Sequence, residues 1–119
     1  FITYCFHSVD GYQKVGSYTG NLSGVTVHTD SNGDGTGTGA FQPRFIMIKR
    51  SDSPSYWFIT DSVRDTSNPR TVGLYPNVSD AELNDSSQSI NFTSTGFEIV
   101  GTFGPINSSG GTHIYLAIA

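Results

Sequence analysis

Three oxygen-bearing side chains at alternate positions give the chain its clearest potential metal site. Asp30, Asn32 and Asp34 supply ligands at the first, third and fifth positions of a calcium loop, and a glycine follows at the sixth. An EF-hand also needs a bidentate glutamate at the twelfth position, which is Phe41 here, so an EF-hand is excluded. The spacing favours a glycine-rich hairpin tip and leaves a looser calcium loop as the alternative.

Aromatic side chains form the second group with the chemistry to recognise a ligand. Tyr56 and Trp57 are neighbours in a predicted strand, so their side chains point to opposite faces of the sheet. One face packs the core, and the other is free to expose an aromatic ring beside polar residues. We predict Tyr56, Trp57 and Tyr75 as ligand-binding residues suited to sugar recognition. Burial of both strand faces is the competing interpretation.

The remaining reactive side chains form no recognisable catalytic group. His7, His28 and His113 each lie in or beside a predicted strand, where a partly buried or cross-strand-paired histidine is expected. A cysteine nucleophile needs a histidine within hydrogen-bond reach and a third orienting group, so Cys5 is expected to be an inert core thiol. The two glutamates and eight aspartates form no evident pair for glycoside hydrolysis, and most aspartates occupy turns. No enzyme is predicted.

Composition limits the elements that can position these residues. Ser, Thr, Asn and Gly account for 50 of 119 residues, and charged residues make up 13%, compared with about 25% in typical soluble domains. No window combines a 3.6-residue apolar period with good helix formers, which excludes helical bundles and coiled coils. The single cysteine excludes an internal disulfide, and the length predicts one domain over residues 1–119.

Charge and the length of the apolar stretches argue against two classes of partner, nucleic acids and membranes. Six basic and ten acidic residues give a net charge of −4, and the basic residues form one small cluster around Lys49 and Arg50, so nucleic-acid binding is not predicted. No apolar stretch approaches the ~20 residues that cross a bilayer, so membrane insertion is not predicted.

The chain opens inside a strand-like stretch without an initiator methionine, and we expect it to be a segment of a longer structural polypeptide.

Short β-type runs alternate with turn clusters at spacings of about 8–12 residues. We predict strands at residues 2–7, 13–19, 24–29, 44–49, 55–60, 71–75, 89–92, 96–100 and 112–118, and one helical turn at residues 79–83. The near-continuous apolar run at residues 44–49 suits a central strand buried on both faces. Together these elements predict an all-β fold, an antiparallel two-sheet β-sandwich of jelly-roll or concanavalin-like type. Residues 30–39 form its exposed loop.

Several short motifs, taken in order, resemble a domain family of unassigned function that recurs in tail-fibre and other virion structural proteins of tailed phages, especially marine ones. The motifs are YCFHS at residues 4–8, GY at 11–12, GSYTGN at 16–21, FQPRF at 41–45, MIKR at 47–50, DSVR at 61–64, the polar stretch 74–82 ending in SDAE, STGF at 94–97 and NSSGGT at 107–112. The chain departs from the family pattern at residues 26–39, where a longer Gly/Asp-rich insertion stands.

The resemblance implies a non-enzymatic structural module on the virion surface, in a tail fibre or a similar appendage. It implies other virion structural proteins as partners, homo-oligomerisation with trimers as the expectation for fibres, and contact with a host-surface glycan. Two alternatives stay open, a capsid decoration or head-fibre protein and a lectin-like glycan-binding module. No cofactor is predicted apart from the calcium alternative at Asp30, Asn32 and Asp34.

Overall fold

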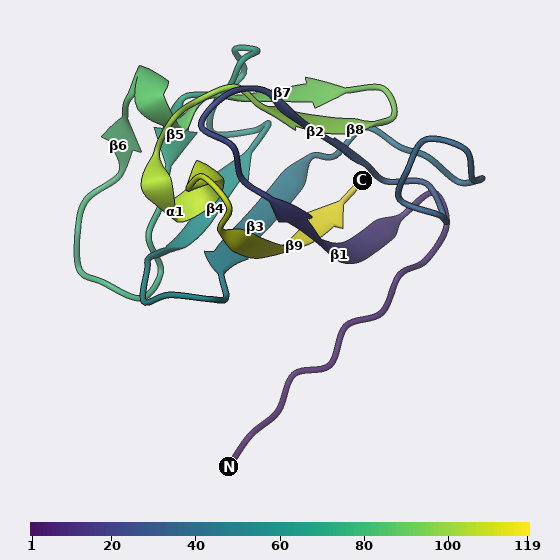
Figure 1. Ribbon diagram of the computed structural model, residues 1–119, viewed down its shortest axis with the longest axis horizontal. Coiled ribbons are helices and arrows are strands. Elements are labelled where there is room, and N and C mark those ends of the chain that lie inside the picture. Colours follow the sequence, from purple (N-terminus) through teal and green to yellow (C-terminus); the bar gives the residue numbers. More distant parts are fainter.

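The chain folds into antiparallel β-structure with very little helix, as the computed structural model of residues 1–119 shows (Figure 1). The strands are β1 Gln13–Thr19, β2 Val25–His28, β3 Phe45–Arg50, β4 Trp57–Asp61, β5 Val72–Gly73, β6 Leu83–Asn84, β7 Ile90–Thr93, β8 Gly96–Ile99 and β9 Thr112–Ile118. They form a four-stranded sheet in the order β1-β9-β3-β4, a three-stranded sheet in the order β2-β8-β7 and the small pair β5-β6. The predicted all-β, antiparallel class is confirmed.

One hydrophobic core receives side chains from both larger sheets. In the four-stranded sheet the strand register places Ile46 beside Ala117, and Ile48 beside Phe58 and Tyr115, so alternate residues of β3, β4 and β9 face inward together. The three-stranded sheet supplies the opposing side chains, and the whole cluster consists of Val27, Phe41, Ile46, Ile48, Phe58, Tyr75, Ile90, Phe92, Phe97, Ile99, Ile106, Tyr115 and Ala117. Burial of this cluster holds the two larger sheets against each other.

Eight of the nine predicted strands overlap an observed strand, and the bounds of β1 and β9 are those predicted. The helical turn predicted at residues 79–83 is wrong, because Leu83 and Asn84 pair with β5 instead. Helical turns form at two other places, the 3₁₀-helix η1 Ser86–Gln88, capped by the side chain of Asp85, and the α-helix α1 Gly104–Asn107. No helix has the length and hydrophobicity to cross a membrane.

The strand predicted at residues 2–7 is also wrong. Val9 and Gln13 form one antiparallel bridge, but the hydroxyl of Ser8 then bonds both the N–H of Val15 (3.2 Å) and its carbonyl (3.4 Å). The hydroxyl of Ser8 therefore occupies the backbone groups of Val15 that would pair with His7 if the ladder continued. Residues 1–8, called the N-terminal segment below, have no strand partner (Figure 1). Cys5 is consequently exposed, which corrects the prediction of a core thiol.

A fully buried amide at the end of α1 joins two loops. The Oδ1 atom of Asn107 accepts hydrogen bonds from the N–H groups of Asn21 (2.9 Å) and Leu22 (3.3 Å). Its Nδ2 donates to the carbonyls of Ser23 (2.9 Å) and Gly101 (2.8 Å). Both donors and the acceptor of the amide are used, so Asn107 fixes the β1–β2 turn against the connection that follows β8.

A buried carboxylate organises the connection between β4 and β5 in the same way. Asp65 accepts hydrogen bonds from the N–H groups of Thr71 (2.7 Å), Val72 (3.1 Å) and Ser67 (3.0 Å). Burial by itself would raise the pKa of Asp65, but these hydrogen bonds, with one from the Ser67 hydroxyl, outweigh burial and hold the pKa below its ordinary value.

An Asn107→Asp substitution replaces two N–H donors with an oxygen that faces two carbonyls in a buried site. We expect the free energy of unfolding to fall by about 2–4 kcal/mol, since the new group is either charged or left without partners. Urea denaturation at pH 7 measures the loss. The matched control is Asn84→Asp, which keeps the acceptor for the Thr71 hydroxyl at an exposed position and should change stability by about 0.5 kcal/mol or less. Equal losses in both variants would contradict the role of Asn107.

Asp65→Asn removes the carboxylate that gathers three backbone N–H groups. At pH 7 the variant should lose about 1–2 kcal/mol of unfolding free energy. Because the folded-state pKa of Asp65 is depressed, its contribution is present above the ordinary aspartate pKa of about 4 and is lost as the pH falls through the folded-state value. Denaturant titrations at pH 7, 5 and 3 should therefore show the deficit of the variant shrinking with acidity. A deficit that is constant over this range would refute the assignment.

Candidate functional site

The middle of the outer face of the four-stranded sheet, turned away from the core, is apolar. On this face Leu116 of the central strand β9 lies beside Val15 of β1 and Met47 of β3. Two residues further along the strands, Ile114 and Trp57 follow on the same face, 44% and 36% exposed, with Lys49 between them in β3. Sheets with one face toward water usually alternate apolar and polar residues, so an apolar stretch of the outer face is a candidate contact surface.

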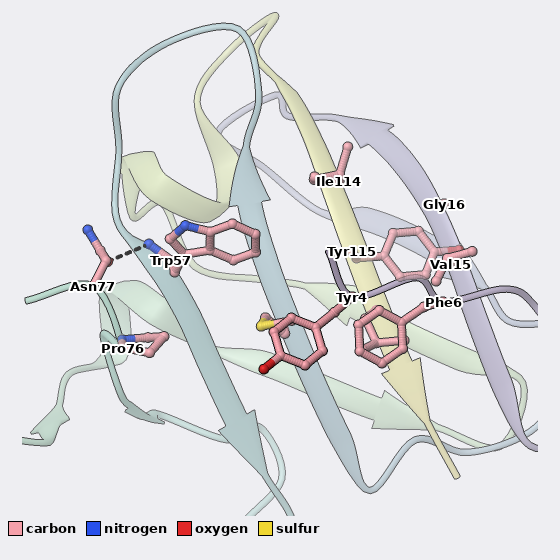
Figure 2. Close-up of a pocket in the computed structure, with 11 residues that line it drawn as sticks. Tyr4, Phe6, Val15, Gly16, Trp57, Pro76, Asn77, Ile114 and Tyr115 are labelled. Atoms are coloured by element: carbon pink, nitrogen blue, oxygen red, sulfur yellow. Dashed lines mark hydrogen bonds between the residues drawn. The ribbon is translucent and has the colours of Figure 1, made fainter. Parts of the chain in front are cut away.

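The N-terminal segment slants away from this face, and the space between the two is a groove. The rings of Tyr4 and Phe6 form one wall, and the outward side chains of the sheet form the floor (Figure 2). The groove encloses about 790 Å³, so the segment overhangs the sheet without packing onto it. Tyr4 stays 81% exposed and Phe6 55% exposed.

The far end of the groove is closed by the loop that contains Pro76 and Asn77. The side-chain oxygen of Asn77 accepts a hydrogen bond from the backbone N–H of Trp57 (2.9 Å), the dashed line in Figure 2. This bond fixes the start of β4 beside the loop. None of the groove residues is charged, and none carries a carboxylate, imidazole or thiol. The chemistry that the groove offers is apolar contact, with an amide and tyrosine hydroxyls at its margin.

The three aromatics predicted to bind a ligand do not share one surface. Trp57 lines the apolar groove, whereas Tyr56 faces a separate polar hollow beside Arg50. Tyr75 is buried in the core, where its hydroxyl bonds Gln88 and its ring lies 5.3 Å from that of Tyr56 between centroids. Burial raises the pKa of Tyr75. Adjacent strand positions point to opposite faces, and this separates Tyr56 from Trp57.

Most of the groove was not anticipated from the sequence, although signals for it were present. Leu116 and Ile114 alternate with core residues of β9, and Met47 does the same in β3, so two central strands are apolar on both faces. A strand of this kind needs a cover on each side. The alternation of Tyr4 and Phe6 with polar residues marks the N-terminal segment as part of the same surface.

The glycine-rich loop holds its two carboxylates in hydrogen bonds of its own. Asp30 accepts from the N–H groups of Gly35 (3.0 Å) and Gly37 (2.6 Å), and Asp34 accepts from the N–H (2.9 Å) and hydroxyl (2.6 Å) of Thr36. For Asp30, burial favours a higher pKa, but the glycine N–H groups lower the pKa below its ordinary value. For Asp34 the hydroxyl of Thr36 is the main cause of a lowered pKa.

The third predicted calcium ligand lies in the same loop. The side-chain Nδ2 of Asn32 donates to the hydroxyl of Thr36 (3.1 Å), which in turn donates to Asp34. The structure thus brings Asp30, Asn32 and Asp34 together as members of one hydrogen-bonded turn. No group of three or more His, Cys, Asp or Glu side chains is arranged to hold a metal ion. The favoured prediction of a glycine-rich turn agrees with these contacts, and calcium binding stays the untested alternative.

His113 is a buried structural residue, as expected for a strand histidine. Its ring stacks on Tyr18 of the neighbouring strand β1, with centroids 5.1 Å apart, and its Nδ1 lies 3.0 Å from the carbonyl of Gly111. Burial lowers the pKa of His113, which favours the neutral ring. His113 therefore belongs to the packing between β1 and β9 and not to a reactive group.

We expect millimolar calcium to leave the melting temperature of the domain unchanged, because Asp30 and Asp34 already have N–H and hydroxyl partners. Thermal unfolding with and without calcium, followed by circular dichroism, tests this. The double variant Asp30→Asn with Asp34→Asn should melt at a lower temperature in both conditions, since it weakens the turn. A calcium-induced rise in the wild type that disappears in the double variant would instead establish the calcium loop.

The geometry of the groove and loop can be set beside known proteins. No curated protein and no solved structure matches the chain. A family model described as a domain of unknown function, DUF7483, matches residues 1–119 and so spans the N-terminal segment, the groove and the glycine-rich loop. The chain belongs to the DUF7483 family.

Proposed function

We propose that this domain is a non-enzymatic assembly module of a virion structural protein, in a tail fibre or a similar surface appendage of a tailed phage. In this proposal the two larger sheets are the β-sandwich predicted from the sequence, and the outer face of one sheet binds neighbouring protein chains. The observation that supports assembly most directly is the uncharged groove of about 790 Å³ on that face. The motifs that resemble phage structural proteins support the virion setting.

The composition of the groove favours a protein partner over a sugar. A sugar ring carries hydroxyl groups that need hydrogen-bond partners when they leave water. The floor of the groove consists of Val15, Met47, Ile114 and Leu116, which offer none. Apolar side chains of a partner, by contrast, gain free energy at about 25 cal/mol for each Å² that is removed from water.

The free energy available from the groove limits how it can be used. Each ~100 Å² of apolar surface that a partner covers contributes about 2.5 kcal/mol, and the groove is small. Association costs an estimated 4–15 kcal/mol in lost translational and rotational freedom. One such contact is therefore marginal by itself, and assembly through the groove is stable when several copies close together or when the parent polypeptide holds the chains near one another.

Met47→Lys places a charge on the groove floor while the long lysine side chain keeps its head in water. In the phage that encodes the protein, we expect this variant to reduce at least tenfold the number of virions that carry the domain on the tail. Gold-labelled antibody raised against the folded domain, counted by electron microscopy, measures this. The reduction follows from the cost of burying an unpaired charge at a protein contact.

The matched control is Val63→Lys, which makes a comparable change at a residue that is 84% exposed and lies outside the groove. It should leave the labelling of tails unchanged. Label on the capsid of wild-type virions would support the decoration protein instead. Wild-type virions without label, or strong binding to a glycan array by the intact protein, would overturn the proposed function.

A further inference from the structure

The N-terminal segment has the pattern of a β-strand and no strand partner in its own chain. Ile2, Tyr4 and Phe6 alternate with Thr3 and Cys5, so an extended segment is apolar along one side. All of these side chains are exposed. Figure 1 shows the segment running away from the sheets as an extended stretch. Leaving this row of apolar side chains in water forfeits the free energy of burying them.

The segment is prevented from joining the sheet of its own chain. The bridge between Val9 and Gln13 sets a register that, if continued, would pair residues 3–7 with the free edge of β1. The hydroxyl of Ser8 occupies the N–H and carbonyl of Val15, the next pair that this ladder requires. The segment therefore leaves the edge and overhangs the outer face, where it leaves the groove open.

The segment and the groove match in charge and in length. Residues 1–9 contain no Asp, Glu, Lys or Arg, and the groove contains none either, so contact buries no unpaired charge. Residues 2–7 extend over about 20 Å at 3.3 Å per residue. A four-stranded sheet is about 14 Å wide from its first to its last strand. One segment is therefore long enough to cross the whole floor of a groove.

We propose that the N-terminal segment of a neighbouring copy of this chain occupies the groove, so that copies exchange segments in a closed ring. Ile2, Tyr4 and Phe6 of one copy pack on Met47 and Leu116 of the next. The exchange rests on the proposed function, since it names the partner that the groove binds. In a closed ring of two or of three copies, every segment occupies a groove and every groove is occupied.

The area that such an exchange buries is that of a small specific interface. Tyr4 and Phe6 each bury on the order of 150–250 Å², which gives about 300–500 Å² for one segment. The groove exposes less surface than the segment, so a ring of two, with two joints, buries roughly 900–1,300 Å². This total lies at the low end of the range of specific protein interfaces.

Light scattering after size exclusion tests the exchange on the full 119-residue chain. The wild type should have two or three times the mass of one chain, 12.8 kDa. The segment variant, Tyr4→Ser with Phe6→Ser, and the groove variant Met47→Lys should each fall to the mass of one chain. Their circular dichroism should match that of the wild type, because these side chains lie outside the core. The control Val63→Lys should keep the wild-type mass.

Mixing the two variants separates exchange from simple contact between sheet faces. The segment variant loses the Tyr4 and Phe6 wall but retains the groove floor, and the groove variant retains its segment, so each mixed pair can form one joint between that floor and that segment. Because one joint is marginal by itself, we expect pairs of twice the single-chain mass only in the concentrated mixture, where native mass spectrometry distinguishes the two variants. A concentrated mixture that contains no more pairs than either variant alone would overturn the exchange.

Two further outcomes distinguish the exchange from the function on which it rests. A wild type that is monomeric at all concentrations, or an oligomer that persists in the segment variant, overturns the exchange alone. In either case, tail labelling that still depends on Met47 would leave the proposed function standing. Conversely, virions without the domain would overturn the proposed function while the mass measurements still decide the exchange.

Discussion

Along most of their length the central strands β9 and β3 carry apolar side chains on both faces. These two central strands place Ile48 and Tyr115 toward the core and Met47 and Leu116 away from it. A sheet built on such strands needs a cover on each side, and the three-stranded sheet supplies one of them. The other side carries a groove under the overhanging N-terminal segment (Figure 2). The groove thus follows directly from the residues that make the fold, and this is the surface that we propose for assembly.

Three buried polar side chains in the remaining parts of the chain organise the connections around this sheet. The amide of Asn107 and the carboxylate of Asp65 each gather backbone groups from connections that leave the larger sheets. In the glycine-rich loop, Asp30 does the same for two glycine N–H groups. Each of these buried polar groups is paired within the chain, as buried polar groups must be. The apolar groove is the opposite case, because its apolar side chains are left open to water.

The sequence predicts the strands that follow from a local alternation of apolar and polar residues. It does not predict features that depend on which segments pair or on which layer covers a strand. The bounds of β1 and β9 follow from their two-residue period, and the central position predicted for residues 44–49 is confirmed. The same apolar run predicted burial on both faces, but Met47 stays partly exposed, because no second layer covers it. Residues 2–7 have strand propensity, yet the hydroxyl of Ser8 takes their pairing site. The placement of Tyr75 in the core and of Trp57 in the groove likewise required the strand register.

In the assembly that we propose, a partner covers the outer face of the four-stranded sheet. Trp57 is the only tryptophan of the chain and lines the groove, so its fluorescence reports on that face alone. Acrylamide quenching, measured from dilute to concentrated protein, follows the exposure of Trp57 to water. We expect quenching to weaken several-fold and the emission to shift to shorter wavelength as the protein assembles. Quenching and emission that stay the same while the mass of the particle increases would show that the groove is not the contact surface.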